Sequence, residues 1–252
     1  MMDKVALQLY SLKDAMASDL IKTIKKVAQI GYTAVQFAGF NDIAAKEVKD
    51  TLRSLGLKPA GAHVSIDYLR DQLDDVLIYH DMIENDYIIV PWIPETMRST
   101  VDDYLRTAEL LDKIGHHLHL RGFKLGYHNH DFEFTTFGDK TGLEIILDHT
   151  DPTHLHLELD CYWGAYKKMD PLAFIDRYAD RCLSLHIKDL KEGDGSLAIS
   201  TELGRGILPL KDYVEKGKEV NVRWLVIEQE HFEQDPFTSA EDNLQVMKKL
   251  MS

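Results

Sequence analysis

The stretch from Leu125 to Phe134 reads Leu-Gly-Tyr-His-Asn-His-Asp-Phe-Glu-Phe, an apolar strand pattern that ends in two imidazoles and two carboxylates. Folding alone does not require such groups at the end of a strand, whereas a metal site or a proton-transfer site does. Three later strand-like runs also end in ligand-type residues: Leu155–Asp160, Leu183–Lys188 and Trp224–Glu230. We expect the fold to bring these four strand ends together around one divalent metal ion.

The elements that must position these groups alternate regularly along the chain. Strands are expected at Lys4–Tyr10, Ala34–Phe37, Leu57–Val64, Tyr87–Val90, Phe123–His128, Leu155–Leu159, Cys182–Ile187 and Trp224–Ile227. Helices are expected at Asp19–Ile30, Ala44–Leu55, Tyr68–Ile83, Val101–Leu120, Leu143–Asp148, Pro171–Tyr178, Leu208–Val220 and Phe237–Leu250. Gly31, Gly56 and Gly122 follow helices, where a C-terminal cap is expected.

Eight strand–helix units in a chain of 252 residues predict an α/β fold, a single (β/α)8 TIM barrel that spans residues 1–252 as one domain. An open doubly wound sheet is the alternative. It is disfavoured because no glycine-rich phosphate fingerprint follows the first strand. The segment Leu190–Pro209 has no clear periodicity and contains Gly193, Gly195, Gly204 and Gly206, so we expect it to fold over the mouth of the barrel.

In a barrel of this kind the active site lies at the carboxyl ends of the strands, and the chemically active residues of this sequence are concentrated there. The residues at these ends are Gln8, Tyr10, Gln36, His63, Pro91, Trp92, His128, His130, Asp131, Glu133, Glu158, Asp160, His186, Lys188, Asp189, Glu228, Glu230 and His231. Carboxylates with one histidine suit Mn²⁺, Mg²⁺, Co²⁺ or a similar ion. A metal that polarises a carbonyl, with two carboxylates to remove and return the proton on the neighbouring carbon, would catalyse proton transfer through an enediolate.

Several of these residue types also have purely structural explanations. His116, His117 and His119 end a helix and are expected at the surface, and His149, His154 and His156 are expected in loops or in packing. His63 fits either a pocket or a hydrogen-bonded core. Glu158 alternates with Asp160, so both face inward or Glu158 supports the site from behind.

The composition restricts the partners and the compartment. The formal net charge of −13 is unfavourable for nucleic acid or anionic lipid, and two cysteines form no disulfide framework. The N-terminus shows no signal-peptide pattern, and no apolar run approaches the roughly 18 residues of a membrane span. We therefore expect a cytoplasmic protein with no nucleic-acid or membrane partner.

The sequence resembles the sugar phosphate isomerase/epimerase superfamily, the xylose isomerase-like TIM barrels, over essentially its whole length. The resemblance rests on the segments 127–134 (YHNHDFEF), 159–163 (LDCYW), 185–189 (LHIKD), 203–206 (LGRG) and 226–230 (VIEQE). Members of the superfamily hold one divalent metal with a glutamate, an aspartate, a histidine and a glutamate on strands five to eight. The resemblance therefore implies Asp160, His186 and Glu228 as metal ligands.

On strand five this chain offers His128 where ketose epimerases have their glutamate. We expect Glu133 to reach back as the fourth ligand, with His128 or His130 as the alternative. Glu133, Glu228 and Lys188 are the expected catalytic residues, and the residues expected to bind a small sugar or keto-sugar are His63, His128, His130, Trp163 and Glu230. Mn²⁺ is the expected ion, with Mg²⁺, Co²⁺ and Zn²⁺ as alternatives, and a homo-oligomer is compatible with the resemblance.

Three other functions remain open at this point. A metal-dependent dehydratase or lyase on a keto-sugar or inosose begins with the same proton abstraction and then expels a β-hydroxyl. A nuclease like endonuclease IV needs more metal ligands and a basic surface, which the charge of −13 disfavours. A non-catalytic sugar-binding barrel predicts lost ligands, whereas here they are present.

Overall fold

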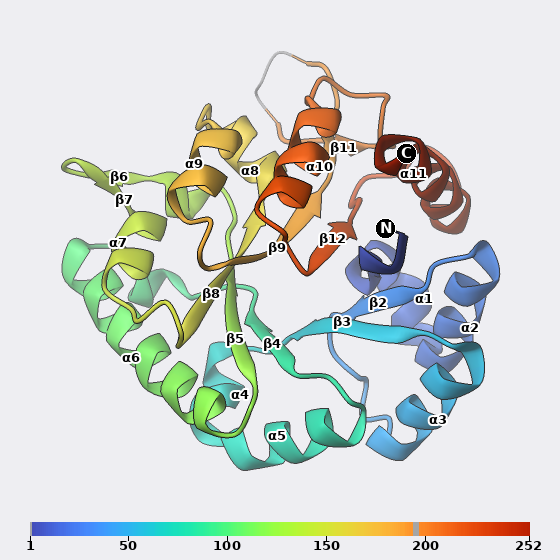
Figure 1. Ribbon diagram of the computed structural model, residues 1–252, viewed down its shortest axis with the longest axis horizontal. Helices are drawn as coiled ribbons and strands as arrows, with labels where there is room; N and C mark the ends of the chain where they lie inside the picture. Colours follow the sequence, from blue (N-terminus) through green and yellow to red (C-terminus); the bar gives the residue numbers. More distant parts are fainter. Residues whose placement is uncertain (1, 194–196) are drawn as a thin grey trace.

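The computed structural model describes residues 2–193 and 197–252. Eight parallel strands close into a barrel in the order β1-β12-β9-β8-β5-β4-β3-β2, with helices around it (Figure 1). The barrel strands are β1 (Val5–Gln8), β2 (Ala34–Phe37), β3 (Lys58–His63), β4 (Tyr87–Val90), β5 (Lys124–His128), β8 (Leu155–Asp160), β9 (Cys182–Ile187) and β12 (Trp224–Ile227). The predicted TIM barrel is confirmed.

The helices lie outside the barrel, between successive strands and, for the last one, after β12. They are α1 (Lys13–Ser18), α2 (Leu20–Ile30), α3 (Ala45–Leu55), α4 (Ile66–Asp71), α5 (Leu73–Met82), α6 (Val101–Leu120), α7 (Gly142–Asp148), α8 (Cys161–Tyr166), α9 (Pro171–Arg177), α10 (Leu210–Glu219) and α11 (Pro236–Met251). Short 3-10 turns occur at Met2–Lys4, Leu9–Leu12, Glu95–Met97 and Phe132–Phe134. Among the described residues, no helix has the length and apolarity that a membrane crossing requires.

The strands are buried on both faces, as expected for a parallel sheet that is covered by helices outside and filled by side chains inside. Tyr87 fills part of the interior, and a Cβ added at Gly126 would come within 2.6 Å of its hydroxyl oxygen. That hydroxyl lies 3.2 Å from Ser184 Oγ, which in turn donates to Glu158. Ser184 is therefore the point at which the apolar interior meets the polar strand ends.

The structure corrects three of the expected boundaries. The helix expected at Tyr68–Ile83 is two helices, α4 and α5, because Gln72 between them leaves the helical conformation at φ −139° and ψ 38°. The first strand ends at Gln8, so Tyr10 lies in the 3-10 turn that follows it. A further helix, α8, begins directly after Asp160, whose side chain caps it.

The described part of the segment Leu190–Pro209 lies beside the barrel mouth. β10 (Asp189–Leu190) pairs with β11 (Ser200–Thr201), and Ser200 Oγ accepts hydrogen bonds from the backbone N–H groups of Glu230 and His231. The expectation for Gly195 lies outside the described residues. This segment therefore packs against the residues that follow β12, where Glu228 and Glu230 lie.

Asp189 fastens the same segment to the end of β9. Its carboxylate accepts hydrogen bonds from the backbone N–H groups of Gly204, Gly206 and Leu208 at 2.9, 2.9 and 3.1 Å. A Cβ at Gly206 would lie 2.3 Å from Asp189 Oδ1, so glycine is required for this close approach.

Candidate metal centre and active site

The structure brings Asp160, His186 and Glu228 together at the carboxyl ends of β8, β9 and β12. Each offers one ligand atom, and these atoms lie within 4.8 Å of one another. His186 Nδ1 is 2.8 Å from Glu228 Oε2. All three side chains are buried. The strands supply this geometry because neighbouring parallel strands end at the same edge, with Asp160 paired in register with His186.

The carboxylate of Asp160 is divided between a structural and an available oxygen. Oδ1 accepts hydrogen bonds from the backbone N–H groups of Tyr162 at 2.9 Å and Trp163 at 3.4 Å, which start α8. Oδ2 is buried and has no hydrogen-bond partner in the described chain. Burial raises the pKa of Asp160 to about 6. The cap fixes the direction of the carboxylate, so that Oδ2 faces the Lys188 ammonium, 3.2 Å away.

Glu158 supports the imidazoles of the site. Its Oε1 lies 2.9 Å from His63 Nε2, 3.0 Å from His186 Nε2 and 3.4 Å from His128 Nδ1. Its Oε2 accepts hydrogen bonds of 2.6 Å from Gln36 and Ser184. A carboxylate with this many partners orients the rings of the site, as carboxylates behind metal-binding histidines do.

His186 is surrounded by acceptors. Besides Glu158 and Glu228, Gln36 Oε1 lies 2.8 Å from its Nε2. Burial lowers the pKa of His186, but the charges and hydrogen bonds of Glu158 and Glu228 outweigh burial and raise it to about 10. A metal ion at this imidazole must therefore compete with a firmly held proton.

Lys188 places an ammonium group among the carboxylates. Its Nζ lies 3.2 Å from both Asp160 Oδ2 and Glu228 Oε2, and 2.5 Å from Glu230 Oε1. The side chain is 1% exposed. Burial lowers the pKa of Lys188, but the three carboxylates outweigh burial and raise it well above its usual range. The lysine is thus a fixed positive charge beside the candidate metal ligands.

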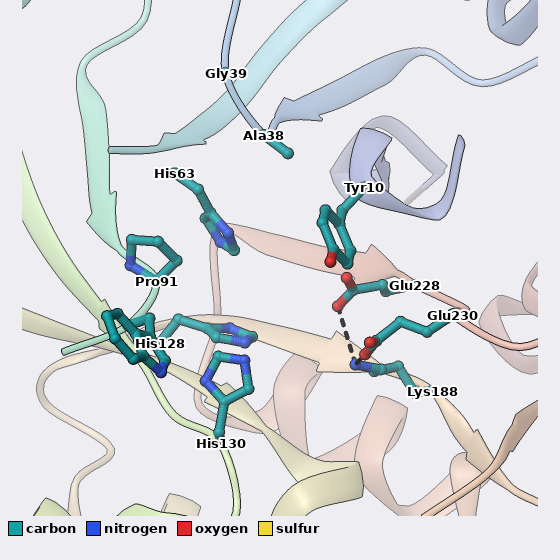
Figure 2. Close-up of a pocket in the computed structure, with 11 residues that line it drawn as sticks. Tyr10, Ala38, Gly39, His63, Pro91, His128, His130, Lys188, Glu228 and Glu230 are labelled. Carbon is teal, nitrogen blue, oxygen red and sulfur yellow. Dashed lines mark hydrogen bonds and ion pairs between the residues drawn. The ribbon is translucent and has the colours of Figure 1, made fainter. Parts of the chain in front are cut away.

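A cavity of about 370 Å³ opens onto these groups (Figure 2). Its wall comprises Tyr10, Ala38, Gly39, His63, Pro91, Trp92, His128, His130, Lys188, Glu228 and Glu230. Figure 2 shows the imidazoles of His63, His128 and His130 facing Glu228, Glu230 and Lys188 across the space. Asp160 and His186 are not part of this wall and are completely buried. The cavity therefore has an imidazole side and a carboxylate–ammonium side.

The structure does not bring Glu133, the expected fourth ligand, to this cluster. Glu133 lies in the 3-10 turn Phe132–Phe134, where Oε1 accepts a 2.7 Å hydrogen bond from the Tyr127 hydroxyl. Its Oε2 accepts another, also 2.7 Å, from the backbone N–H of His130. Both oxygens are therefore used within the β5 turn, and Glu133 belongs to neither group of candidate ligands.

His128 and His130, the expected alternatives to Glu133, lie at the end of β5 and just after it, and both border the cavity. His128 is buried, its Nδ1 has no hydrogen-bond partner in the described chain, and its Nε2 lies 3.9 Å from Asp160 Oδ2. Burial lowers the pKa of His128 well below its usual value and that of His130 to about 3. Neutral imidazoles of this kind are suitable metal ligands. His128 also forms a second candidate ligand group with His63, Glu158 and His186.

Of the residues expected to bind a sugar, some line the cavity and one does not. His63, His128, His130 and Glu230 line the cavity as expected, whereas Trp163 does not. The Trp163 ring packs 5.8 Å from the His130 ring, and Lys188 Nζ lies 5.4 Å from its centroid. Trp163 therefore supports two residues of the site from outside the cavity wall.

Gln36, Glu158 and Ser184 build the network under the imidazoles. Gln36 and Glu158 were expected at the strand ends, and Glu158 supports the site from behind, one of the two alternatives. Ser184 was not singled out from the sequence, although the period-2 pattern of β9 places it on the same face as His186. Ala38 and Gly39 line the cavity without any chemical signal in their side chains.

The donor set fits a divalent cation. It combines the carboxylates of Asp160 and Glu228 with the imidazole of His186, all buried. Mixed nitrogen and oxygen ligands suit Mn²⁺, Zn²⁺, Co²⁺ and related ions. Asp160 Oδ2 accepts no hydrogen bond in the described chain, and the Lys188 ammonium 3.2 Å away is a positive charge that a divalent cation would replace or share there.

Residues 24–250 match the family model described as a xylose isomerase-like TIM barrel. The chain belongs to this family. Among solved structures, this family member is similar to a sugar phosphate isomerase/epimerase from Parabacteroides distasonis, with a TM-score of 0.82 and 22% identity over 97% of this chain and 93% of that one. It is also similar to D-psicose 3-epimerase from Clostridium cellulolyticum H10, with a TM-score of 0.74 and 12% identity over 99% of each chain.

Among curated proteins, this xylose isomerase-like chain is similar to the inosose dehydratase of Geobacillus kaustophilus, at 23% identity over 193 residues. The aligned region is 68% of this chain and 62% of that protein, so the chain spans less than two thirds of its relative. The structural similarities, at 22% identity and below, establish the fold.

Proposed function

We propose that the protein is a divalent-metal-dependent sugar isomerase or epimerase that removes a proton beside the carbonyl of a small sugar or keto-sugar. The observation that carries the proposal is the group Asp160, His186 and Glu228, whose Glu228 and neighbouring Lys188 open onto a cavity of about 370 Å³. With the metal bound, these residues would hold an ion that polarises the carbonyl, and Mn²⁺ is our proposed ion.

His63 and Glu228 are the proposed acid and base. They face each other across the cavity (Figure 2), so one can take a proton from a carbon while the other returns it from the opposite side. Glu158 Oε1 lies 2.9 Å from His63 Nε2, which is the arrangement of a base held by a third group. Lys188 would stabilise negative charge that develops on the substrate oxygen. Glu133, which lies away from the cavity, has no part in this step.

A dehydratase or lyase acting on a keto-sugar or inosose is the second candidate, and two observations favour it. The imidazole of His63 and the carboxylate of Glu228 could divide an elimination between them, one removing the carbon-bound proton and the other protonating the departing hydroxyl. The curated relative to which the chain is similar is an inosose dehydratase. Both candidates share the first proton abstraction, and they differ in whether a proton is returned or a β-hydroxyl leaves.

The cavity wall carries Lys188 as its single described lysine or arginine, so we propose a substrate without phosphate. Phosphate recognition typically uses an arginine fork or several donors. A small non-phosphorylated sugar is therefore the proposed partner.

The test begins with chelator-treated protein that is titrated with Mn²⁺, Mg²⁺, Co²⁺ and Zn²⁺. We expect one ion per chain in the wild type and none in Asp160→Ala or His186→Ala, while the exposed control Asp14→Ala retains it. The loaded protein is then incubated with keto-sugars and inosose in D₂O. Deuterium in an isomerised or epimerised sugar supports the first candidate, and loss of one water supports the second. Absence of metal uptake by the wild type would refute both.

A further inference from the structure

A second cavity, of about 680 Å³, adjoins the first. The residues that line it come from the segment after β2, the segment after β3 and the helices α4 and α5: Gly39, Phe40, Asn41, Asp42, Ile43, Ala44, Ala45, His63, Val64, Ser65, Tyr68, Asp75, Val76, Tyr79 and His80. Cavities that bind drug-sized molecules measure roughly 300–1,000 Å³, so this space can hold a ring system in addition to the sugar.

The two cavities share Gly39 and His63. Gly39 has a φ of +103°, and a Cβ at this position would meet no described atom within 4 Å. The wall at Gly39 thus carries no side chain to separate the spaces. His63, whose ring contacts Glu158, borders both cavities. A molecule held at the carboxylates could therefore continue past His63 into the second cavity.

The second cavity has an aromatic wall that is held in place. The Phe40 ring lies 4.4 Å from the Tyr79 ring and 5.5 Å from the His80 ring, measured between centroids. The Tyr79 hydroxyl donates to the Ile43 carbonyl at 2.8 Å, which ties α5 to the segment after β2. Tyr68 is 45% exposed at the rim. Aromatic faces of this kind bind flat, apolar groups.

The polar groups of the cavity argue against an anionic ligand. No described lysine or arginine lines it, whereas Asp42 and Asp75 do. Asn85 Nδ2 donates to the Tyr87 carbonyl and lies 2.8 Å from His80 Nδ1, so Nδ1 is the acceptor and the proton of the neutral ring lies on Nε2. His80 is thus a fixed donor beside the aromatic wall, and a phosphate or carboxylate would find no positive side chain there.

We infer that the second cavity binds the aglycone of a glycoside, a neutral aromatic or alicyclic ring attached to the sugar that lies at the metal centre. The inference rests on the proposed function, because it gives the substrate of the same site an additional group. Because the glycosidic carbon of such a substrate has no free carbonyl, the carbonyl in the first cavity is a ketone elsewhere on the sugar. The aglycone stacks near Phe40 and Tyr68, and His80 donates to an oxygen of the aglycone or of its linkage.

The probes for the test are glucose and the phenyl α- and β-D-glucopyranosides, whose dissociation constants are measured by calorimetric or NMR titration with Mn²⁺ present. We expect one phenyl glucoside to bind at least about tenfold more tightly than glucose, as burial of an aromatic ring predicts. Tyr68→Ala removes part of the wall, and Ala44→Trp fills the cavity from an exposed position. Both should reduce the preference to less than about threefold without weakening glucose, and Ile78→Ala, exposed on the same helix α5 outside the cavity, should retain it.

Equal affinity for glucose and both phenyl glucosides, or a preference that survives both variants, would overturn the inference. The proposed function fails by a different result, the absence of metal uptake or of deuterium exchange. A protein that exchanges deuterium into free keto-sugars but shows no phenyl preference keeps its function and loses the aglycone site. A protein that prefers phenyl glucosides but takes up no metal keeps the aglycone site and loses the proposed function.

Discussion

Replacing Glu133 by glutamine tests whether this residue is a metal ligand or a buried structural carboxyl. Both oxygens of Glu133 accept hydrogen bonds, from Tyr127 and from the His130 backbone, and the side chain is completely buried. Burial raises the pKa of Glu133 to about 7, and these hydrogen bonds oppose the increase only in part. We therefore expect Glu133→Gln to bind the metal with unchanged stoichiometry and to fold with a different pH dependence.

The magnitude follows from the difference between the folded and unfolded pKa values. An acid whose pKa is raised from 4.5 to about 7 binds its proton more tightly in the folded state. Its favourable contribution is complete below pH 4.5 and is lost as the pH rises to about 7. At 1.36 kcal/mol per pH unit, the loss is about 3 kcal/mol. The glutamine variant has no such loss, so its free energy of unfolding should gain about 3 kcal/mol relative to the wild type between pH 4 and pH 8.

The assay is urea unfolding of metal-free wild type and Glu133→Gln at several pH values from 4 to 8, followed by circular dichroism. Glu47→Gln, an exposed position on α3, is the control and should follow the wild type throughout. A difference between Glu133→Gln and wild type that changes by less than about 1 kcal/mol over this range would refute the burial argument. Loss of the metal from Glu133→Gln would restore Glu133 as a ligand.

Three further outcomes are expected. Lys188→Met should bind the divalent ion about tenfold more tightly in titrations, because a competing positive charge is removed, and should lose deuterium exchange. Metal binding should release a proton from His186, whose pKa is raised to about 10, so the affinity should increase with pH up to about that value. Calorimetry in buffers of different ionisation enthalpy measures the released proton, and the same enthalpy in all buffers would contradict it. Gly206→Ala should lower the free energy of unfolding by about 1–3 kcal/mol through overlap with Asp189, whereas Gly193→Ala, where a Cβ meets no described atom within 4 Å, should not.

The fold could be predicted because its signals are local. Apolar runs of strand length alternate with helical periodicity, and Gly31 and Gly56 end helices in the left-handed conformation expected of a glycine cap. The break at Gln72 could not be predicted, since neither proline nor glycine marks it. It depends on how α4 and α5 pack rather than on their own residues.

The candidate site was partly predictable for a geometric reason. Asp160, His186 and Glu228 end strands, and a barrel brings strand ends together whatever the loops do. Glu133 lies five residues after the last residue of β5, so its position depends on the path of a loop. That loop turns the carboxylate back to Tyr127, and no periodicity in the sequence shows this.

The hydrogen-bonded chain beneath the site has a consequence for assembly. Gln8 on β1 donates to Gln36 on β2, Gln36 donates to Glu158 on β8, and Glu158 contacts His186 on β9. The first strand of the barrel thus orients a histidine on one of the last, although it supplies no ligand itself. The barrel closes only when β1 pairs with β12, which is synthesised last of the barrel strands. The metal therefore cannot stabilise an early intermediate of the nascent chain. Metal affinity would then report barrel closure, and a refolding chain should regain helix signal before it regains the ion.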